Sequence, residues 1–381
     1  MKNYTTIFRQ ILQLIPANIV NRAVKNYCGD RYIKHFKTSQ LLVALIYAQI
    51  AGKKSLRDIE TGLLSQKNKL YHLRLKQPKR SNLSHACKNR DCRIFEEIYY
   101  SLYAHFTANS RSSKFNLKVP VYALDSTKIN LCLKLFPWAK YRRKKGAMKL
   151  HNLLDLDNGV PAFMVMTDAK IHDMKAAWEF ELPISPDSIL TMDRGYVDYE
   201  WFNKLNNEGI FFVTRAKVNM NYKLVKRDPP IYPDDEGKIL SDDIIELTGV
   251  QAQKKYDGKL RVIIAYDKTK DKIIEILTNN FSLSASVIAE IYRSRWEIEE
   301  FFRWIKQNLK ISNFFGTSEN AVMLQVWSAM IYYLLLFYMS VQMKPDFGFL
   351  ELSRRICASL FEATHLLGLL SLNFPPPKKT N

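Results

Sequence analysis

The hydrophobic pattern changes its period near Pro120, and this change constrains the fold more than any other feature of the sequence. Before it, apolar residues recur at helical spacing, for example over residues 41–52 and 93–106. After it, short apolar runs alternate with turn residues, and two strand patterns flank Asp157-Asn158-Gly159, a strong β-hairpin signal. The chain is therefore predicted to begin with an all-α region and to continue as an α/β region.

The α/β region is predicted to form a mixed sheet. In chain order it shows three strands, a helix, a strand, a helix and a strand, over residues 119–124, 148–156, 160–167, 173–182, 188–192, 199–207 and 210–214. From Arg215 to Thr278 short alternating segments predict an inserted β-rich part. A long helix is predicted from Ser284 to Lys310.

The segment 321–343 contains no charged residue and is long enough to span a bilayer. Polar residues such as Gln325 and Ser328 recur along it, and the rest of the chain is charged and basic. We interpret it as a buried core helix and expect no membrane association. The five cysteines form no CxxC pair, which favours reduced thiols in a cytoplasm, and the N-terminus lacks the apolar core of a signal peptide.

Positive charge is concentrated at the beginning of the chain. The net charge is +20, and residues 1–118 contain 22 Lys and Arg against 6 Asp and Glu. Such an excess on one part of a chain is typical of a nucleic-acid-binding module, although a merely solubilising surface is the alternative. A second basic run precedes the hairpin and includes Arg142 and Arg143. It is compatible with contact to DNA phosphates and with a solvated loop.

Two carboxylates follow predicted strands. Asp125 is expected just after the first strand and Asp193 just after the fourth. Ligands of α/β sheets bind beyond the carboxyl ends of strands, where such side chains converge. Either aspartate alone is more simply a turn or helix cap. His151 and His172 lie on nearby predicted elements and are further candidates for the same region.

Four polar residues share one face of the helix predicted over 284–310. Tyr292, Arg295, Glu299 and Lys306 follow one another at steps of 3, 4 and 7. At about 100° per residue they form a stripe about 60° wide, beside an apolar flank that is expected to pack on the core. Ordinary i,i+4 pairing of Arg295 with Glu299 is the structural alternative.

A set of three carboxylates has a specific chemical use. Two divalent ions about 3.5–4 Å apart, held by shared carboxylates, activate the attacking oxygen and stabilise the leaving oxygen in phosphoryl transfer. Asp125, Asp193 and Glu299 would supply that set, and Mg²⁺ suits it because this ion prefers oxygen ligands. Tyr292, Arg295 and Lys306 would then hold the strand that is cut.

These motifs resemble those of a known family. Asp125-Ser126-Thr127, Asp193-Arg194-Gly195-Tyr196 and the Tyr-x2-Arg-x3-Glu-x6-Lys spacing are similar to bacterial insertion-sequence transposases of the DDE superfamily, in particular the group with the Tyr-Arg-Glu-Lys signature. The resemblance implies catalytic and metal-binding roles for Asp125, Asp193 and Glu299. It also implies DNA-binding roles for the three other signature residues.

The resemblance further implies an RNase H-like mixed-sheet catalytic domain with a β-rich insertion. We expect a helical DNA-binding domain over residues 1–110 and a catalytic domain over 118–215 and 282–345. The insertion is expected over 216–281, and a C-terminal helical segment with its tail over 346–381. The family is similar to cut-and-paste enzymes whose reaction passes through a hairpin at the excised end.

The expected function is therefore metal-dependent hydrolysis and strand transfer at the ends of an insertion sequence. The expected partners are double-stranded DNA, as terminal inverted repeats and target, and a second copy in a synaptic homodimer. The expected cofactor is a pair of Mg²⁺ ions, for which Mn²⁺ would substitute, and the expected location is the cytoplasm, at the nucleoid. The alternatives are a domesticated DNA-binding protein without catalysis and an RNase H-like nuclease or resolvase without strand transfer.

Overall fold

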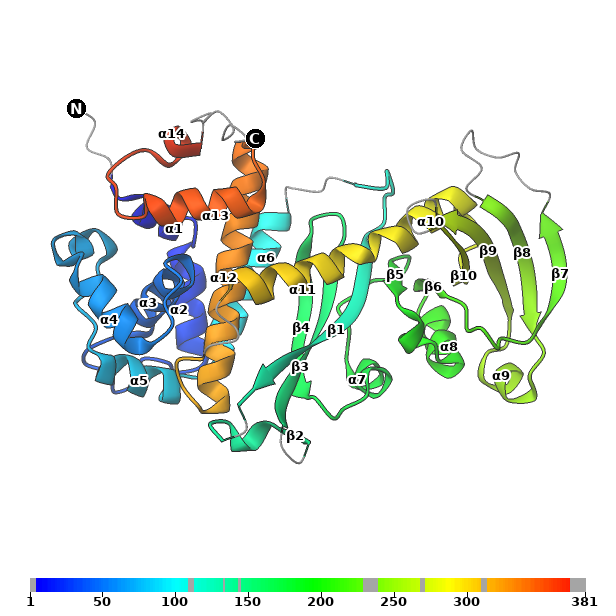
Figure 1. Ribbon diagram of the computed structural model, residues 1–381, viewed down its shortest axis with the longest axis horizontal. Coiled ribbons are helices and arrows are strands. Elements are labelled where there is room, and N and C mark those ends of the chain that lie inside the picture. The colour runs from blue at the N-terminus through cyan, green and yellow to red at the C-terminus, as the bar shows by residue number, and fades with distance from the viewer. Residues whose placement is uncertain are drawn as a thin grey trace, which may run out of the picture. The chain divides into compact units, whose positions relative to one another are not determined.

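The computed structural model describes residues 5–108, 113–132, 134–142, 145–228, 239–267, 271–309 and 314–370. The chain divides into two compact units (Figure 1). The first unit combines Met1–Ser110 with Trp304–Asn381, and the second unit is Arg111–Arg303.

The first unit is made of helices in the described part of the chain. Its N-terminal part contains α1 (Ile7–Gln13), α2 (Ala17–Asn26), α3 (Thr38–Ile50), α4 (Leu56–Leu64), the 3-10 helix η1 (Lys67–Leu73), α5 (Arg80–Asn89) and α6 (Arg93–Thr107). Its C-terminal part contains α12 (Glu319–Met343), α13 (Phe349–Ala358) and α14 (Leu366–Leu370). The prediction of helices in the N-terminal region is confirmed.

The long helix α12 forms the core of the first unit. It is long and apolar enough to cross a membrane, yet most of it is buried inside the protein. Helices α3, α5, α6 and α13 pack around it, and the rings of Tyr99 and Tyr100 both lie 5.5 Å from Trp327. A helix covered by its own chain on every side is apolar all round. The prediction of a buried core helix is confirmed.

The second unit is built on one mixed sheet. Its strands are β1 (Val121–Leu131), β2 (Lys140–Arg142), β3 (Lys145–Asp155), β4 (Val160–Asp168), β5 (Ile189–Met192), β6 (Phe211–Arg215), β7 (Tyr222–Asp228), β8 (Ile239–Leu247), β9 (Lys259–Asp267) and β10 (Lys272–Thr278). The strand order is β2-β3-β1-β5-β6-β10-β9-β8-β7, and β4 pairs with β3. Strands β1, β5 and β6 run parallel, and the other pairs are antiparallel. The predicted mixed α/β architecture is confirmed.

Helices connect and cover these strands. They are the 3-10 helix η2 (Pro137–Ala139), α7 (Asp173–Glu179), the 3-10 helix η3 (Arg194–Tyr196), α8 (Tyr199–Asn207), α9 (Val250–Lys255), α10 (Ala285–Ser294) and α11 (Trp296–Asn308). Helix α10 packs on β5, β6, β8 and β9. Figure 1 shows that β7–β10, the β-rich part predicted after Arg215, continue the same sheet beyond β6.

The first strand is longer than the sequence pattern predicts. We expected it to end before Asp125, but β1 runs on to Leu131. The extension pairs with β3 down to Leu131 opposite Gly146, and Asp125 faces Asn152. That expectation is wrong because the antiparallel partner, which the local pattern does not reveal, supplies backbone hydrogen bonds beyond the apolar run.

The helix predicted over 284–310 is interrupted at Arg295. Helix α10 ends at Ser294 and α11 begins at Trp296. At the junction the Arg295 N–H donates to the Tyr292 carbonyl and the Ile298 N–H to the Arg295 carbonyl, each at 3.2 Å. These hydrogen bonds span three residues, as in a 3-10 helix, and are tighter than those of an α-helix. Lys310 lies outside the described residues.

Candidate functional site

The sheet brings two predicted aspartates to the same edge. The parallel pairing of β1 with β5 ends at Leu124 opposite Met192, and the next residues are Asp125 and Asp193. Asp125 Oδ1 accepts the N–H of Ser126 at 2.7 Å, and Asp193 Oδ1 accepts the N–H of Gly195 at 2.8 Å. Both carboxylates therefore follow the carboxyl end of a parallel pair, where α/β sheets bind ligands.

The glycine of Asp193-Arg194-Gly195-Tyr196 has a steric role. A Cβ atom at position 195 would lie 2.9 Å from Asp193 Oδ1, closer than real Cβ contacts allow. The glycine lets the backbone N–H approach and orient that carboxylate. The following Tyr196 is buried and anchors the turn in the core.

The third predicted carboxylate comes from the helix junction. Arg295 Nη2 donates to Glu299 Oε1 at 2.7 Å, and Nη1 of the same guanidinium lies 3.8 Å from Asp125 Oδ2. The Arg295 side chain is 14% exposed, so solvent screens these ion pairs little. One guanidinium thus links Asp125 on the sheet to Glu299 on α11.

The electrostatics of Asp125 reflect this crowding. Burial raises the pKa of Asp125 to about 7. The N–H of Ser126 and the charge of Arg295 lower that pKa, while the charges of Asp193 and Glu299 raise it. Because the charges of the two other acids act on Asp125, the three predicted carboxylates share one electrostatic site.

A second polar cluster lies on the opposite face of β1 and β3. Ser126, which follows Asp125, donates its hydroxyl to Asp173 Oδ1 at 2.5 Å. The buried Lys149 reaches the same carboxylate at 3.1 Å and donates to the Ile171 carbonyl at 2.7 Å. His151 faces Ser126 across the strands and bonds Thr167 at 2.9 Å. The interpretation of His151 as a residue lining the carboxylate site is therefore wrong, because strand alternation turns it away.

The predicted DNA-binding residues other than Arg295 lie on α10, on α11 and at the end of β2, or outside the described residues. Tyr292 is in the last turn of α10 and acts electrostatically on Arg295. Lys306 is on α11, seven residues after Glu299, in the part of that helix that belongs to the first unit. Arg142 ends β2, and Arg143 lies outside the described residues.

Comparison with known proteins identifies the family. Residues 117–335, more than half of the chain, match the family model described as the transposase DDE domain. The chain belongs to the DDE transposases. Residues 3–76 of this DDE transposase match a second model, a domain of unknown function, DUF4372.

Three relatives of this chain are also named as transposases. It is 31% identical to the putative transposase y4zB of Sinorhizobium fredii (strain NBRC 101917 / NGR234) over 303 residues, which cover 79% of this chain and 82% of the relative. It is 29% identical to the probable transposase for insertion sequence element IS5377 of Geobacillus stearothermophilus, over 67% of this chain and 70% of the relative. It is 25% identical to the putative transposase for insertion sequence element IS4SA of Synechocystis sp. (strain ATCC 27184 / PCC 6803 / Kazusa), over 84% and 86%. The chain is therefore a bacterial insertion-sequence DDE transposase by family.

A solved structure gives a weaker match. The piggyBac transposase, in a synaptic complex with hairpin DNA, aligns with 92% of this chain and 79% of its own at a TM-score of 0.42 and 11% identity. Two chains at this TM-score need not share a fold.

Membership of the DDE transposases implies dependence on a divalent metal. Among the described residues, no group of three or more His, Cys, Asp or Glu side chains is arranged to hold an ion. Arg295 instead supplies positive charge to Asp125 and Glu299. The donor chemistry nevertheless fits a hard cation, because Asp125, Asp193 and Glu299 offer carboxylate oxygens and the charges of Asp193 and Glu299 raise the pKa of Asp125.

Orphaned polar atoms next to the carboxylates support this fit. Both side-chain atoms of Asn152, Oγ1 of Thr191 and Nε of Arg295 are buried without a hydrogen-bond partner among the described residues. A buried polar group without a partner costs about 1–3 kcal/mol, so native proteins keep few of them. Their position beside Asp125 and Asp193 indicates that the site takes up further polar ligands or water.

The sequence reasoning missed Asn152 and Thr191. Asn152 lies opposite Asp125 on β3, and Thr191 lies on β5 opposite Ala123, which shares the Asp125 face of β1. An asparagine or threonine inside a strand has no motif of its own. Only the register of β1 with its two neighbours shows that both side chains lie on the carboxylate face.

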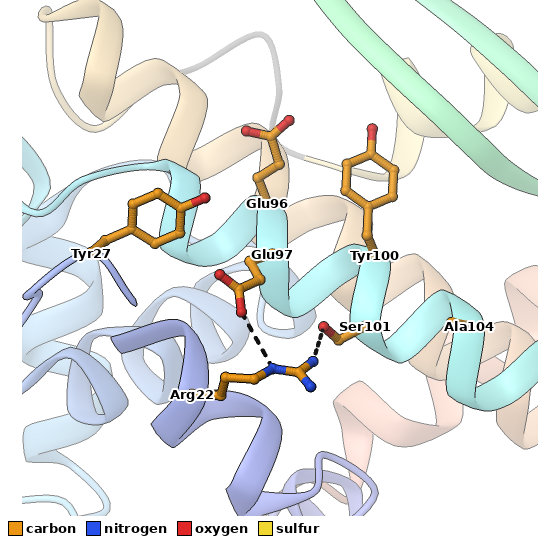
Figure 2. A pocket seen from close by; sticks show the side chains of 7 residues that line it. All are labelled: Arg22, Tyr27, Glu96, Glu97, Tyr100, Ser101 and Ala104. Carbon is orange, nitrogen blue, oxygen red and sulfur yellow. Dashed lines mark hydrogen bonds and ion pairs between the residues drawn. The ribbon is translucent and has the colours of Figure 1, made fainter. Parts of the chain in front are cut away.

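A hollow of about 560 Å³ in the first unit is lined by residues that do not suit DNA binding. Figure 2 shows Arg22 of α2 bound by Glu97 and Ser101 of α6, with Glu96, Tyr27 and Tyr100 around them. Burial raises the pKa of Glu96. Because the arginine is already paired and two carboxylates line the walls, this hollow does not suit a DNA phosphate.

Proposed function

We propose that the chain catalyses cut-and-paste transposition of an insertion sequence. Water would attack a phosphodiester at the element end, and the 3′ oxygen would leave and take up a proton. The freed 3′ hydroxyl would then attack a target phosphodiester, so that one ester bond replaces another. The observation that carries the proposal is that Asp125 and Asp193 follow the same end of the parallel pair β1–β5, while Arg295 links Asp125 to Glu299 on α11, in a DDE transposase.

The proposed site binds two Mg²⁺ ions, and Mn²⁺ would substitute for them. Asp125, Asp193 and Glu299 would hold the ions, which supply positive charge to the attacking and leaving oxygens. Within the protein, the Ser126 and Gly195 N–H groups fix one oxygen of each aspartate. This leaves the second oxygen of each carboxylate available.

The residues proposed to bind the DNA strand are Tyr292, Arg295 and Lys306, together with Arg142 at the end of β2 and Arg143, which lies outside the described residues. This is the set of the Tyr-Arg-Glu-Lys group, to which we assign the chain. The planar guanidinium of Arg295 can bind a phosphate with two hydrogen bonds, whereas Lys306 acts as a point charge. Arg295 would exchange its carboxylate partners for a DNA phosphate as substrate binds.

We propose an RNase H-like catalytic domain over residues 118–215 and 282–345, whose last helix, α12, packs with the N-terminal helices in the first unit. We further propose an insertion over 216–281 and a C-terminal segment over 346–381. The strand order β4-β3-β1-β5-β6 supports this fold, since it is antiparallel on one side of β1 and parallel on the other.

The proposed end-recognition domain is residues 1–110. Its basic segment, residues 67–80, carries the exposed side chains Lys67, Lys69, Arg74, Lys76, Lys79 and Arg80. Leu70, Leu73 and Leu75 are buried and anchor the segment, and Tyr71 between them is 71% exposed. Exposed cations beside an exposed aromatic ring suit DNA phosphates. The partners would be terminal inverted repeats and target DNA, bound by a homodimer in the cytoplasm, at the nucleoid.

A matched pair of variants tests the catalytic assignment. Glu299→Gln should abolish nicking of a plasmid that carries the element ends in Mg²⁺. Glu300→Gln, the exposed next residue on α11, should nick at the wild-type rate. End binding should survive in both, because affinity comes mainly from Lys and Arg. Near wild-type nicking by Glu299→Gln would disprove the assignment.

The products of the same reaction separate the alternatives. A transposase yields joined donor–target molecules, whereas an RNase H-like nuclease or resolvase yields cut DNA without joints. A domesticated DNA-binding protein would bind the ends in a mobility-shift assay and yield neither product.

A further inference from the structure

The residue directly across from Asp125 is unusual. Asn152 on β3 is the antiparallel partner of Asp125 on β1, so both side chains lie on the same face of the sheet. Asn152 is fully buried, and neither its Nδ2 nor its Oδ1 has a hydrogen-bond partner among the described residues. An apolar residue of similar size, such as leucine, would fill this place without leaving polar atoms unpaired.

The carboxylate opposite has unused acceptor capacity. Asp125 Oδ1 accepts the Ser126 N–H at 2.7 Å, while Oδ2 has the Arg295 guanidinium at 3.8 Å, beyond hydrogen-bond distance. An ionised carboxylate accepts about four hydrogen bonds, and a carboxamide nitrogen donates two. The pair Asp125 and Asn152 therefore combines a free acceptor with a free donor.

A second buried polar side chain, that of Thr191, supports the same interpretation. Thr191 on β5 is fully buried, and its hydroxyl has no partner in the described part of the chain. It precedes Asp193 by two residues, and its partner Ala123 precedes Asp125 by two residues. Each aspartate thus has one unpaired polar side chain beside it on the carboxylate face.

We propose that Asn152 is a positioning residue for Asp125. Its Nδ2 donates to the Asp125 carboxylate when Arg295 leaves that carboxylate for a DNA phosphate, and the hydrogen bond holds Asp125 in the orientation that binds the cation. The unpaired state in the free protein is the cost of this role. The proposal rests on the proposed catalytic role of Asp125.

The full-length chain with Asn152→Leu gives the main test. In EDTA the variant should melt above the wild type, because leucine removes two unpaired buried polar atoms. The rise in melting temperature on titration with Mn²⁺ should occur at tenfold or higher Mn²⁺ concentration, since the partner that orients a metal ligand is missing. Higher stability together with weaker Mn²⁺ binding is the result that a packing role would not give.

Two further variants cover the case in which leucine does not fit. Asn152→Ser and Asn152→Ala are of similar size, but only serine keeps a donor. The Asn152→Ser protein should bind Mn²⁺ at least threefold more tightly than the Asn152→Ala protein. Leu150→Met, two residues earlier on the same face of β3, is the packing control and should bind Mn²⁺ as the wild type does.

The outcomes separate this inference from the function on which it rests. Equal Mn²⁺ affinity in serine and alanine variants, or unchanged affinity in Asn152→Leu, overturns the role of Asn152. The proposed role of Asn152 is also overturned if Mn²⁺ does not change the melting temperature of the wild-type protein. If Asp125→Asn keeps cleaving DNA, the proposed function fails instead, whatever the Asn152 variants do.

Discussion

The Nη1 atom of Arg295 lies 3.8 Å from Oδ2 of Asp125 and so connects the helix junction to strand β1 of the sheet. The same guanidinium bonds Glu299 at 2.7 Å. Arg295 therefore neutralises, in the free protein, the charges that the divalent cations of the proposed site would neutralise. A cation and Arg295 should be partial substitutes for each other.

Replacement of Arg295 tests this substitution. In Arg295→Gln the carboxylates lose their counter-charge, so the metal-free protein should melt lower than the wild type. Mg²⁺ should then raise the melting temperature of the variant by about 2–4 °C more than it raises that of the wild type. Scanning fluorimetry with and without Mg²⁺ measures the difference. Arg293→Gln, an exposed neighbour on α10, is the control, and equal Mg²⁺ responses in all three proteins would contradict the substitution.

The glycine beside Asp193 gives a prediction about geometry. In Gly195→Ala the new Cβ would lie 2.9 Å from Asp193 Oδ1, so the carboxylate or the turn must shift. A misplacement of this kind at a catalytic group costs up to about 100-fold in rate, while DNA binding should not change. Gly249→Ala is the control, because its Cβ would make only an ordinary 3.6 Å contact with Ala252. Nicking by Gly195→Ala at the rate of the control would show that the glycine is dispensable.

Local patterns predicted the elements better than their pairing. Apart from the short strand β2 and the 3-10 helices, the order of elements from Val121 to Arg215 and the buried helix α12 follow from periodicity and turn signals. The extension of β1 past Asp125 depends on β3, whose paired residues run from Asn152, opposite Asp125, to Gly146, opposite Leu131. The break at Arg295 depends on two backbone hydrogen bonds that leave the helical pattern of side chains unchanged. Nonlocal pairing and backbone detail are what a pattern of residue types cannot contain.

The candidate site also contains residues that local patterns predict and residues that only the strand pairing reveals. The three carboxylates were predicted because each belongs to a recognisable motif, and in the structure the charges of Asp193 and Glu299 raise the pKa of Asp125. Asn152 could not be predicted, since its relation to Asp125 exists only in the β1–β3 register. That register is fixed by the whole hairpin and its burial, because a slip of one residue would turn Asn152 to the face that His151 now occupies.

A buried ion pair in the β-rich part leads to a stability prediction. Arg261 binds both oxygens of Asp242, at 2.7 and 2.6 Å, and donates to the carbonyls of Asn280 and Leu283 just before α10. Arg261→Met should lower the free energy of unfolding by about 3–5 kcal/mol, because Asp242 would remain buried without a partner. Urea denaturation followed by circular dichroism measures this loss.

The controls for Arg261 use a second pair on the same sheet. Lys223 and Glu246 form an ion pair at 2.7 Å with side chains 60% and 34% exposed, so Lys223→Met should cost less than about 1 kcal/mol. The double variant Arg261→Met with Asp242→Leu should recover part of the loss, since no charge is then left unpaired. A single variant Arg261→Met as stable as Lys223→Met would mean that the buried pair does not hold α10 to the sheet.

His151 gives the pH dependence of stability. Burial lowers its pKa to about 4; Lys149 acts in the same direction, and Asp173 opposes both. In the unfolded chain histidine takes up a proton near pH 6.5. As the pH falls from about 6.5 to 4, only the unfolded state binds this proton, so up to about 3 kcal/mol of stability is lost. His151→Gln should flatten the fall of melting temperature between pH 7 and 5, whereas His85→Gln, exposed on α5, should not. Parallel pH curves for wild type and His151→Gln would show that the buried imidazole does not cause the acid sensitivity.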